Sequence, residues 1–348
     1  MNKKEPKRIL LARTDRLGDV VLSTAVVKFL REEYPSAYIA MLIRPYTAEV
    51  FKNDPNLDKV IVYDKHNEHK SFYGTVKFAL SLRKMKFDTA IAFHPTNRVH
   101  LMFFVAGIPE RIGYNRDLGW MLTRKMPYRK HEGKMHEADY NFELLKNSGF
   151  DVSRADRHPY IVTDDGDKNM VEKIMKECGI GEDFITIHAG ASCPSKRWPA
   201  VRFAEVAATL ARDFECGIVL IGGHGTENDN NTIMSLAGNR AVDLTDMLRV
   251  GELAELLKRS RLFISNDSGP VHIAVAVGTP VVCIFGRRDP GLSPLRWGPL
   301  GKSDIVLHKD VGCGVCLAHN CDKGFKCLEA VTVDEVVEAA KKILSIGH

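Results

Sequence analysis

Short apolar runs alternate with amphipathic stretches along most of this chain. In the first half, this pattern predicts a helix over residues 19–33 and strands at 8–11, 38–43, 60–63 and 89–93. The pattern restarts in the second half, where we predict strands at 184–188, 217–221, 241–244, 262–265, 280–285 and 304–307. Strands that alternate with helices in this way indicate parallel sheets joined by crossover helices.

Two sheets of this kind predict an α/β protein with two doubly wound, Rossmann-like domains that face each other across a cleft. A chain of 348 residues is long enough for about two domains with full cores. The polar stretch 163–168 is the best candidate for a linker. We therefore place an N-terminal domain at residues 1–165, a second domain at 166–331 and a C-terminal segment at 332–348.

Composition and charge exclude several classes of protein. The chain is 45% hydrophobic and 27% charged, as in ordinary globular domains, and no apolar run approaches the ~20 residues of a membrane span. Its basic start lacks the apolar core of a signal peptide, so we expect a cytoplasmic protein. The net charge of +5 permits contact with acidic lipid or a phosphorylated substrate, but it is too diffuse to indicate nucleic acid.

The segment 263–286 carries the strongest signal for a binding site. It predicts a strand, a tight turn at Asp267, Ser268 and Gly269, a helix that begins at Pro270, and a second strand. Backbone amides at the start of this helix would face the carboxyl end of the sheet, where open α/β sheets bind anions and nucleotides. The alternative is a capped strand–helix–strand unit without a ligand.

Gly18 and Asp19 follow the first predicted strand and begin its helix. The helix start favours a carboxylate, so we expect a lowered pKa for Asp19. A carboxylate at this edge of the sheet could accept a proton from a substrate hydroxyl. The alternative is that Asp19 only caps the helix, and Asp15 is a weaker candidate for the same role.

Two further loops combine small residues with charge. Residues 188–199 place Lys196 and Arg197 where they suit a diphosphate, although a solvated pair of cations is the alternative. Glu227 follows a glycine-rich loop and could accept hydrogen bonds from ribose hydroxyls, or it could simply start an exposed helix. The chain has no P-loop and no G-x-G-x-x-G motif after the first strand, which argues against a P-loop NTPase and weakens a dinucleotide oxidoreductase.

As a set, these motifs resemble the ADP-heptose:lipopolysaccharide heptosyltransferases, glycosyltransferase family 9. The resemblance rests on segments that run through both halves of the chain, at residues 13–24, 196–199, 265–272, 278–280, 285–286 and 289–290. It implies a GT-B fold with an acceptor-binding N-terminal domain and a nucleotide-sugar-binding second domain. It also implies that a final helix, at 333–344, packs back on the N-terminal domain.

The reaction that this resemblance implies is transfer of heptose from ADP-L-glycero-D-manno-heptose to a hydroxyl of the lipopolysaccharide inner core, with inversion and without a required cofactor. It makes Asp19 the general base and Lys196 the cation that neutralises the departing diphosphate. Donor binding falls on a larger set of residues: Gly18, Ser192, Glu227 at the ribose, Met247 at the adenine, Asp267 at the donor sugar, and Ser268, Gly269 and His272.

The acceptor side is marked only by many cations between residues 98 and 130. Such a face could hold the phosphates of a lipid-linked core oligosaccharide or contact the anionic inner membrane, whereas a plain charged surface is the default interpretation of each single residue. We therefore expect ADP-heptose and a lipid-linked core acceptor as partners, at the cytoplasmic face of the inner membrane, and no nucleic acid.

Four of the eight cysteines, Cys313, Cys316, Cys321 and Cys327, have the spacing C-x2-C-x4-C-x5-C. In a cytosolic protein this spacing favours a metal over disulfides, and four thiolates would suit a structural zinc or iron. The usual zinc pattern separates its two cysteine pairs more widely. Free thiols and a redox-formed disulfide therefore stay open as alternatives.

Two other functions are compatible with the same residues. One keeps the enzyme and changes the substrate, to another nucleotide-sugar donor or a protein acceptor. The other is a non-catalytic nucleotide-sugar-binding protein that retains the fold. The presence of both Asp19 and Lys196 argues against the second alternative, because loss of the base is the simplest way to lose activity.

Overall fold

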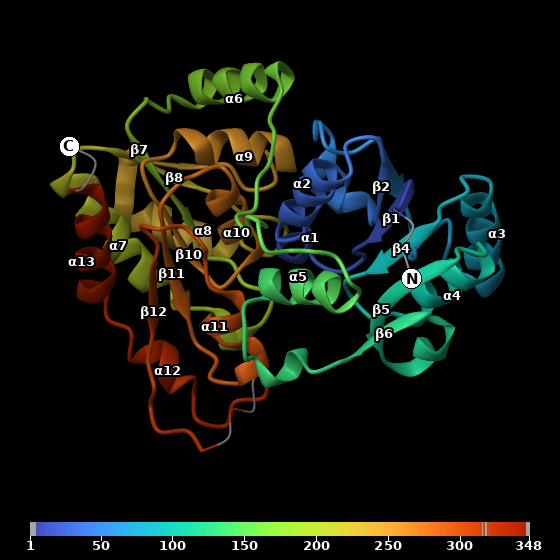
Figure 1. Ribbon diagram of the computed structural model, residues 1–348. Coiled ribbons are helices and arrows are strands. Elements are labelled where there is room, and N and C mark those ends of the chain that lie inside the picture. The colour runs from blue at the N-terminus through green and yellow to red at the C-terminus, as the bar shows by residue number, and fades with distance from the viewer. Residues whose placement is uncertain (1–4, 315, 317–318, 346–348) are drawn as a thin grey trace. The chain divides into compact units, whose positions relative to one another are not determined.

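The computed structural model describes residues 5–314, 316 and 319–345, and the chain folds into two compact units (Figure 1). The first unit holds the residues up to His131 together with Glu137–Val162, and the second holds Glu132–His136 and the chain from Thr163 onward. Each unit is built on one six-stranded parallel sheet.

The sheet of the first unit has the strand order β3-β2-β1-β4-β5-β6. Its strands are β1 (Arg8–Ala12), β2 (Tyr38–Ile43), β3 (Lys59–Val62), β4 (Thr89–Ala92), β5 (Glu110–Asn115) and β6 (Arg124–Pro127). Leu10 lies opposite Ala40 and Ala90, and all three are fully buried. Such strands are buried on both faces, which explains their continuous apolar runs. We predicted β1 to β4 but missed β5 and β6, whose runs are interrupted by charged residues.

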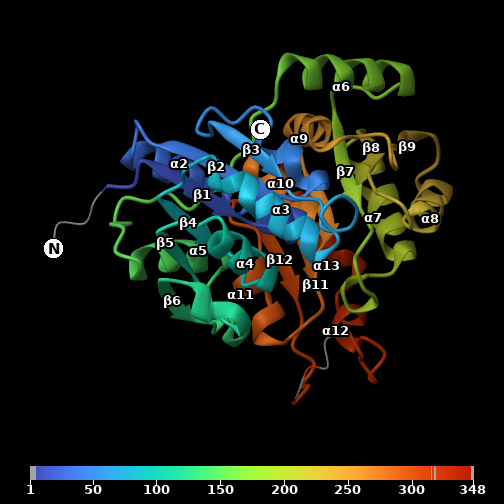
Figure 2. The ribbon, with the colours of Figure 1, turned by 90° about the vertical axis from the view of Figure 1, so that its right-hand side faces the viewer.

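Five α-helices belong to the described part of the first unit: α1 (Leu17–Val21), α2 (Thr24–Glu33), α3 (Phe72–Arg83), α4 (Asn97–Val105) and α5 (Glu137–Asn147). Leu82 of α3 and Met102 of α4 pack on the same core as Leu10 of β1. The two helices lie side by side (Figure 2).

The helix predicted over 19–33 is in fact two helices, α1 and α2. The break follows from two hydroxyl groups that donate to backbone carbonyls, Ser23 to Asp19 at 2.9 Å and Thr24 to Val21 at 2.8 Å. As a result, Gly18 and Asp19 lie in a separate short helix directly after β1.

The sheet of the second unit has the strand order β12-β11-β10-β7-β8-β9. Its strands are β7 (Phe184–His188), β8 (Gly217–Leu220), β9 (Ala241–Asp243), β10 (Phe263–Asn266), β11 (Val281–Phe285) and β12 (Ile305–His308). Ile264 lies opposite Ile187 and Val282 in the buried centre of this sheet. All six strands were predicted to within one residue at each end.

The α-helices of the second unit are α6 (Asp165–Cys178), α7 (Ala200–Asp213), α8 (Glu227–Ala237), α9 (Val250–Arg259), α10 (Gly269–Ala276), α11 (Pro294–Trp297), α12 (Lys326–Glu329) and α13 (Val333–Leu344). The stretch 163–168, which we predicted to be a linker, is largely the first turn of α6. Asp164 accepts the N–H of Asp167 at 2.8 Å, and the carboxylate of Asp167 accepts the N–H of Asp164 at 3.2 Å, which caps the helix.

The C-terminal helix α13 packs within the second unit. Val336, Ala340 and Ile343 are buried in one core with Phe203 and Leu210 of α7. We expected this helix to pack on the N-terminal domain, whereas residues of the second unit cover its apolar face. The second unit includes Glu132–His136 and the chain from Thr163 onward, whereas we placed the domain boundary after residue 165.

Both sheets have the doubly wound order, in which successive strands run first to one side of the starting strand and then to the other. The predicted α/β fold class is confirmed. In the part of the chain that the structure describes, no helix combines the length and apolar character needed to cross a membrane.

Candidate functional site

The strand order reverses between β1 and β4 in the first unit and between β7 and β10 in the second. In doubly wound sheets, the carboxyl ends of such a strand pair form the crevice in which ligands bind. Asp19 comes after β1, Lys196 after β7 and Asp267 after β10. The fold thus brings three of the predicted site residues to positions where ligands bind in this architecture.

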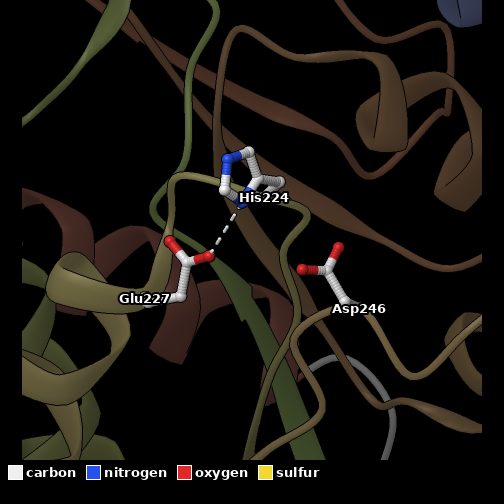
Figure 3. Close-up of side chains that lie close together, drawn as sticks. All are labelled: His224, Glu227 and Asp246. Atoms are coloured by element: carbon white, nitrogen blue, oxygen red, sulfur yellow. Dashed lines mark ion pairs between the residues drawn. The ribbon is translucent and has the colours of Figure 1, made fainter.

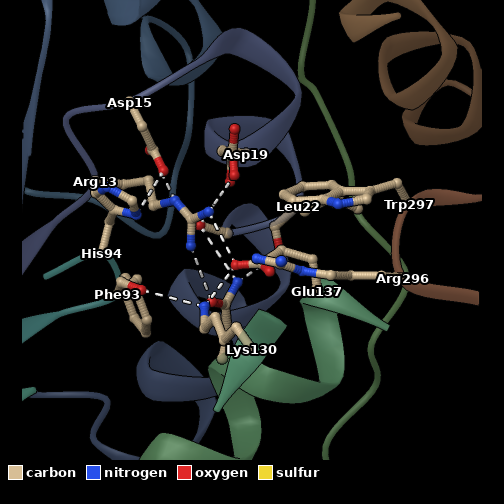
Figure 4. A network of polar contacts seen from close by, with 12 residues as sticks. Arg13, Asp15, Asp19, Leu22, Phe93, His94, Lys130, Glu137, Arg296 and Trp297 are labelled. Atoms are coloured by element: carbon tan, nitrogen blue, oxygen red, sulfur yellow. Dashed lines mark hydrogen bonds and ion pairs between the residues drawn. The ribbon is translucent and has the colours of Figure 1, made fainter. Parts of the chain in front are cut away.

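Arg13 is the first residue after β1, and its side chain is almost completely buried. Its guanidinium donates to Asp15 at 2.8 Å and to Glu137 at 3.0 Å, and it also contacts Asp19 through the nitrogen that serves Glu137 (Figure 4). Burial alone would lower the pKa of Arg13, but the three carboxylates raise it well above its ordinary value. Arg13 is therefore a permanent cation at the centre of this cluster.

Lys130 adds a second buried cation to the cluster. Its ammonium group lies 2.5 Å from Glu137, at the start of α5, and 3.2 Å from the carbonyl oxygen of Phe93. Two cations thus face the three carboxylates of Asp15, Asp19 and Glu137.

The environment of Asp19 raises the pKa of its carboxyl group to about 6. Burial is the largest cause, the charge of Asp15 acts in the same direction, and Arg13 opposes both. Our expectation of a lowered pKa was wrong, because α1 has only five residues and burial outweighs its dipole. A carboxylate with a pKa just below neutrality is ionised at neutral pH and remains basic enough to take a proton.

His94 follows β4 at the same edge of the sheet. Its Nδ1 lies 3.5 Å from the carboxylate of Asp15 (Figure 4). Burial lowers the pKa of His94 to about 4, and Arg13 adds to this effect, so the ring is neutral at neutral pH. We did not predict His94 or Glu137, and we expected Lys130 only as one of the cations between residues 98 and 130. Arg13 could have been found from the sequence, because it is a charged residue directly after an apolar strand.

Three buried charged side chains meet at the carboxyl edge of the second sheet. Lys196 ends the short 3-10 helix Pro194–Lys196, Asp267 follows β10, and Arg287 follows β11. The same oxygen of Asp267 lies 2.9 Å from the ammonium of Lys196 and 2.8 Å from the guanidinium of Arg287. We predicted Lys196 at the diphosphate and Asp267 at the donor sugar, but we did not predict that the two side chains pair with each other. Arg287 was missed.

The start of α10 lies directly after Asp267. Ser268 occupies the N-cap position but makes no capping hydrogen bond with its side chain. Its hydroxyl instead lies 3.1 Å from Nδ1 of His188 and 2.9 Å from the hydroxyl of Ser265. Burial lowers the pKa of His188 to about 4, so this ring is neutral. Pro270 has no N–H, and the N–H of Val271 donates to the carbonyl oxygen of Ser268 at 3.3 Å. The N–H of Gly269 is therefore the donor at the start of this helix that suits an anion.

The other predicted residues of the second unit lie on neighbouring segments. Ser192 is exposed in the loop after β7, whereas His272 is buried within α10. Gly190 starts this loop, and a Cβ there would lie 2.8 Å from Nε2 of His188 and 2.6 Å from Thr226. Only glycine fits between these side chains, so the loop passes close over the end of the sheet.

Glu227 and Met247 lie at the carboxyl ends of β8 and β9. Glu227 begins α8 and accepts the N–H of Gly225 at 2.8 Å, and Met247 is about half exposed. The carboxylates of Glu227 and Asp246 and the ring of His224 offer ligand atoms within 4.8 Å of one another (Figure 3). All three residues are exposed, and exposed acidic groups are common without an ion, so we assign no cation to them.

The four clustered cysteines line one pocket, together with Lys309, Lys323 and Lys326. All four are free thiols of intermediate burial. Within the described residues, no three of their sulfur atoms lie within 4.8 Å of one another, whereas thiolates around one metal ion must lie close together. The predicted metal site therefore gains no support from their arrangement.

Comparison with known proteins identifies the family. Residues 75–326 match the model of glycosyltransferase family 9 (heptosyltransferase). Lipooligosaccharide heptosyltransferase 2 of Campylobacter jejuni is 24% identical over 342 residues, which cover 95% of this chain and 97% of the relative.

Two solved structures share the fold over 98% of this chain. The glycosyltransferase of family 9 from Veillonella parvula has a TM-score of 0.85 and 26% identity, with 98% of its chain covered. The ADP-heptose lipopolysaccharide heptosyltransferase II of Escherichia coli has a TM-score of 0.79 and 21% identity, with 99% covered. The chain belongs to glycosyltransferase family 9, the heptosyltransferase family.

Proposed function

We propose that this glycosyltransferase moves heptose from ADP-L-glycero-D-manno-heptose to a hydroxyl of the lipopolysaccharide inner core, with inversion at the anomeric carbon. The observation that carries the proposal is the buried carboxylate of Asp19, which has a pKa of about 6 and lies after β1 at the reversal of the strand order. Family membership and the names of the relatives supply the choice of sugar.

Asp19 acts as the general base in this proposal. Oδ1 of Asp19 contacts Arg13, whereas its other oxygen has no hydrogen-bond partner among the described residues. That oxygen accepts the proton of the acceptor hydroxyl as the hydroxyl oxygen forms its bond to the anomeric carbon. The bond between that carbon and the diphosphate breaks, and ADP leaves with the bonding electron pair. Attack from the side opposite the leaving group inverts the anomeric centre.

The second unit binds the donor in this proposal. Lys196 and the N–H of Gly269 at the start of α10 meet the negative charge that develops on the departing diphosphate. These groups do so without a divalent cation, so transfer needs no cofactor. Glu227 lies on the ribose, Met247 on the adenine and Asp267 near the sugar. Ser192, Ser268, Gly269 and His272 complete the donor site in this unit.

The first unit binds the acceptor, a lipid-linked core oligosaccharide, at the cytoplasmic face of a membrane. Phe72 and Tyr73 at the start of α3 are 73% and 75% exposed, and Lys70 and Lys77 beside them are also exposed. Aromatic rings next to cations suit the interface of an anionic bilayer, which combines apolar chains with negative head groups. This surface supports peripheral contact with the membrane that carries the acceptor.

A calorimetric titration with ADP, ADP-heptose, UDP and NAD, without added metal, tests the donor. We expect tight binding of ADP-heptose and ADP and none of UDP or NAD. Preference for UDP would move the function to another nucleotide sugar, and binding of no nucleotide would refute the donor site. Binding of ADP-heptose without any transfer would favour the non-catalytic alternative, and transfer to a polypeptide would favour a protein acceptor.

A structural zinc or iron at Cys313, Cys316, Cys321 and Cys327 is a separate proposal, which is based on the spacing of these cysteines in the sequence. Elemental analysis of the purified protein tests it. We expect about one equivalent of metal per chain, and loss of that metal in the variant Cys313→Ser/Cys316→Ser. A metal content near zero in protein purified without chelator would contradict the proposal.

A further inference from the structure

Arg287 is a buried cation whose position the proposed reaction does not yet explain. Its side chain is 4% exposed, and one guanidinium nitrogen, Nη2, donates to Asp267 at 2.8 Å. Its Nε is buried and has no hydrogen-bond partner among the described residues. A buried N–H without a partner is costly, so this atom marks a place where a ligand oxygen would be favoured.

The charges around Arg287 do not balance. Asp267 is already paired with Lys196 at 2.9 Å, and the same carboxylate oxygen accepts from Arg287. The buried trio therefore carries one excess positive charge. Burial of an unbalanced charge is unfavourable unless a counter-charge arrives, which points to an anionic ligand.

The backbone places Arg287 beside the loop that carries Lys196. A Cβ at Gly286 would lie 2.5 Å from the carbonyl oxygen of Ser195, so the end of β11 lies directly against this loop. The uncapped start of α10 follows Asp267, the shared partner of both cations. Lys196, Arg287 and the start of α10 are thus three sources of positive potential at one edge of the second sheet.

We propose that Arg287 is a second cationic ligand of the nucleotide diphosphate, and that its Nε–H donates to a phosphate oxygen while Nη2 holds Asp267. This inference rests on the proposed function, because it takes the donor to be a nucleoside-diphosphate sugar. Asp267 then has a positioning role as well, since its one oxygen holds Lys196 and Arg287 toward the same ligand. Arginine suits this task because its planar group can serve two acceptors at once.

The test compares ADP with adenosine, which lacks the diphosphate, in calorimetric titrations of the full chain. In Arg287→Gln we expect ADP affinity to fall roughly ten- to a hundredfold, as for loss of a charge-assisted hydrogen bond, with adenosine affinity unchanged. Arg288→Gln is the matched control: the neighbouring side chain is about half exposed and pairs with Asp310 at 3.0 Å. We expect this control to bind ADP like the parent.

A second comparison separates ligand binding from mere neutralisation of Asp267. In an Asp267→Asn background, a direct contact with the diphosphate predicts that Arg287→Gln still weakens ADP binding. If Arg287 only neutralises Asp267, the added substitution has no effect there, and that result would overturn the inference.

Equal losses of ADP and adenosine affinity in Arg287→Gln, or no loss of either, would also overturn it. These outcomes differ from failure of the proposed function, in which the parent protein itself would not bind ADP. Thermal melting of each variant shows whether it folds.

Discussion

Arg13 contacts the carboxylate of Asp19 with the same guanidinium nitrogen that donates to Glu137 at 3.0 Å. Glu137 also pairs with the ammonium group of Lys130, whereas Asp19 contacts Arg13 through one carboxylate oxygen. Arg13 therefore orients Asp19 and leaves its second oxygen available to a substrate. The raised pKa of Asp19 adds the basicity that proton transfer requires.

Asp19→Asn should abolish most of the activity without loss of the donor site. We expect turnover to fall roughly a hundredfold or more, because an amide cannot accept the proton, with ADP affinity nearly unchanged. Steady-state kinetics and calorimetry check the two parts separately. The control is Asp165→Asn, at a carboxylate whose side chain is 90% exposed on α6. Turnover equal to that of the parent would remove Asp19 from the mechanism.

The pH dependence of transfer should follow the carboxyl group of Asp19. Only the ionised form accepts a proton, so kcat/KM should fall as the pH drops through about 6. Asp15 contributes to the raised pKa, so Asp15→Asn should move this acidic limb to lower pH. Activity that is flat between pH 5 and pH 7, or a limb that moves to higher pH in the variant, would contradict the assignment.

Lys196→Ala should weaken ADP binding and slow transfer together. We expect a loss of roughly tenfold or more in ADP affinity, since a buried charge-assisted contact to the diphosphate disappears. Asp267 keeps Arg287 as a partner in this variant, so the fold should survive. Lys173→Ala, at an exposed lysine of α6, removes the same charge elsewhere. If Lys196→Ala binds ADP as tightly as that control, the diphosphate site lies elsewhere.

Removal of the exposed rings on α3 should reduce membrane binding. We expect Phe72→Ser/Tyr73→Ser to lower the affinity for vesicles that contain phosphatidylglycerol by roughly tenfold. The variant lacks the two aromatic rings whose apolar area is buried in the interfacial region of the bilayer. Cosedimentation measures the effect. The control is Leu236→Ser, which removes an apolar side chain that is about half exposed on α8. Equal binding of both variants and the parent would argue that α3 does not contact the membrane.

Much of the fold could be predicted because most of its strands are buried on both faces. Strands such as β2 and β11 are continuous apolar runs, and their bounds were predicted to within one residue. β6 was missed because it forms the sheet edge and begins with Arg124 and Lys125. The break at Ser23 was missed because it depends on hydroxyl contacts that the helical pattern does not reveal.

The candidate site could be predicted only where a local motif carries it. Asp19, Lys196 and Asp267 each lie in a segment that follows a predicted strand, and such segments can be recognised in the sequence. Glu137 and Arg287 reach the site through the topology, from segments 124 and 20 residues away from their partners Arg13 and Asp267. Their contacts, and the pKa that burial gives to Asp19, exist only in the folded chain.

The most direct test of the proposed activity is a transfer assay read by mass spectrometry. The full chain is incubated with ADP-L-glycero-D-manno-heptose and a set of lipid-linked core acceptors, each lacking one heptose. We predict that one of these acceptors gains a single heptose and that an equal amount of ADP is released. No change in any acceptor, together with transfer from another nucleotide sugar, would contradict the heptosyltransferase assignment.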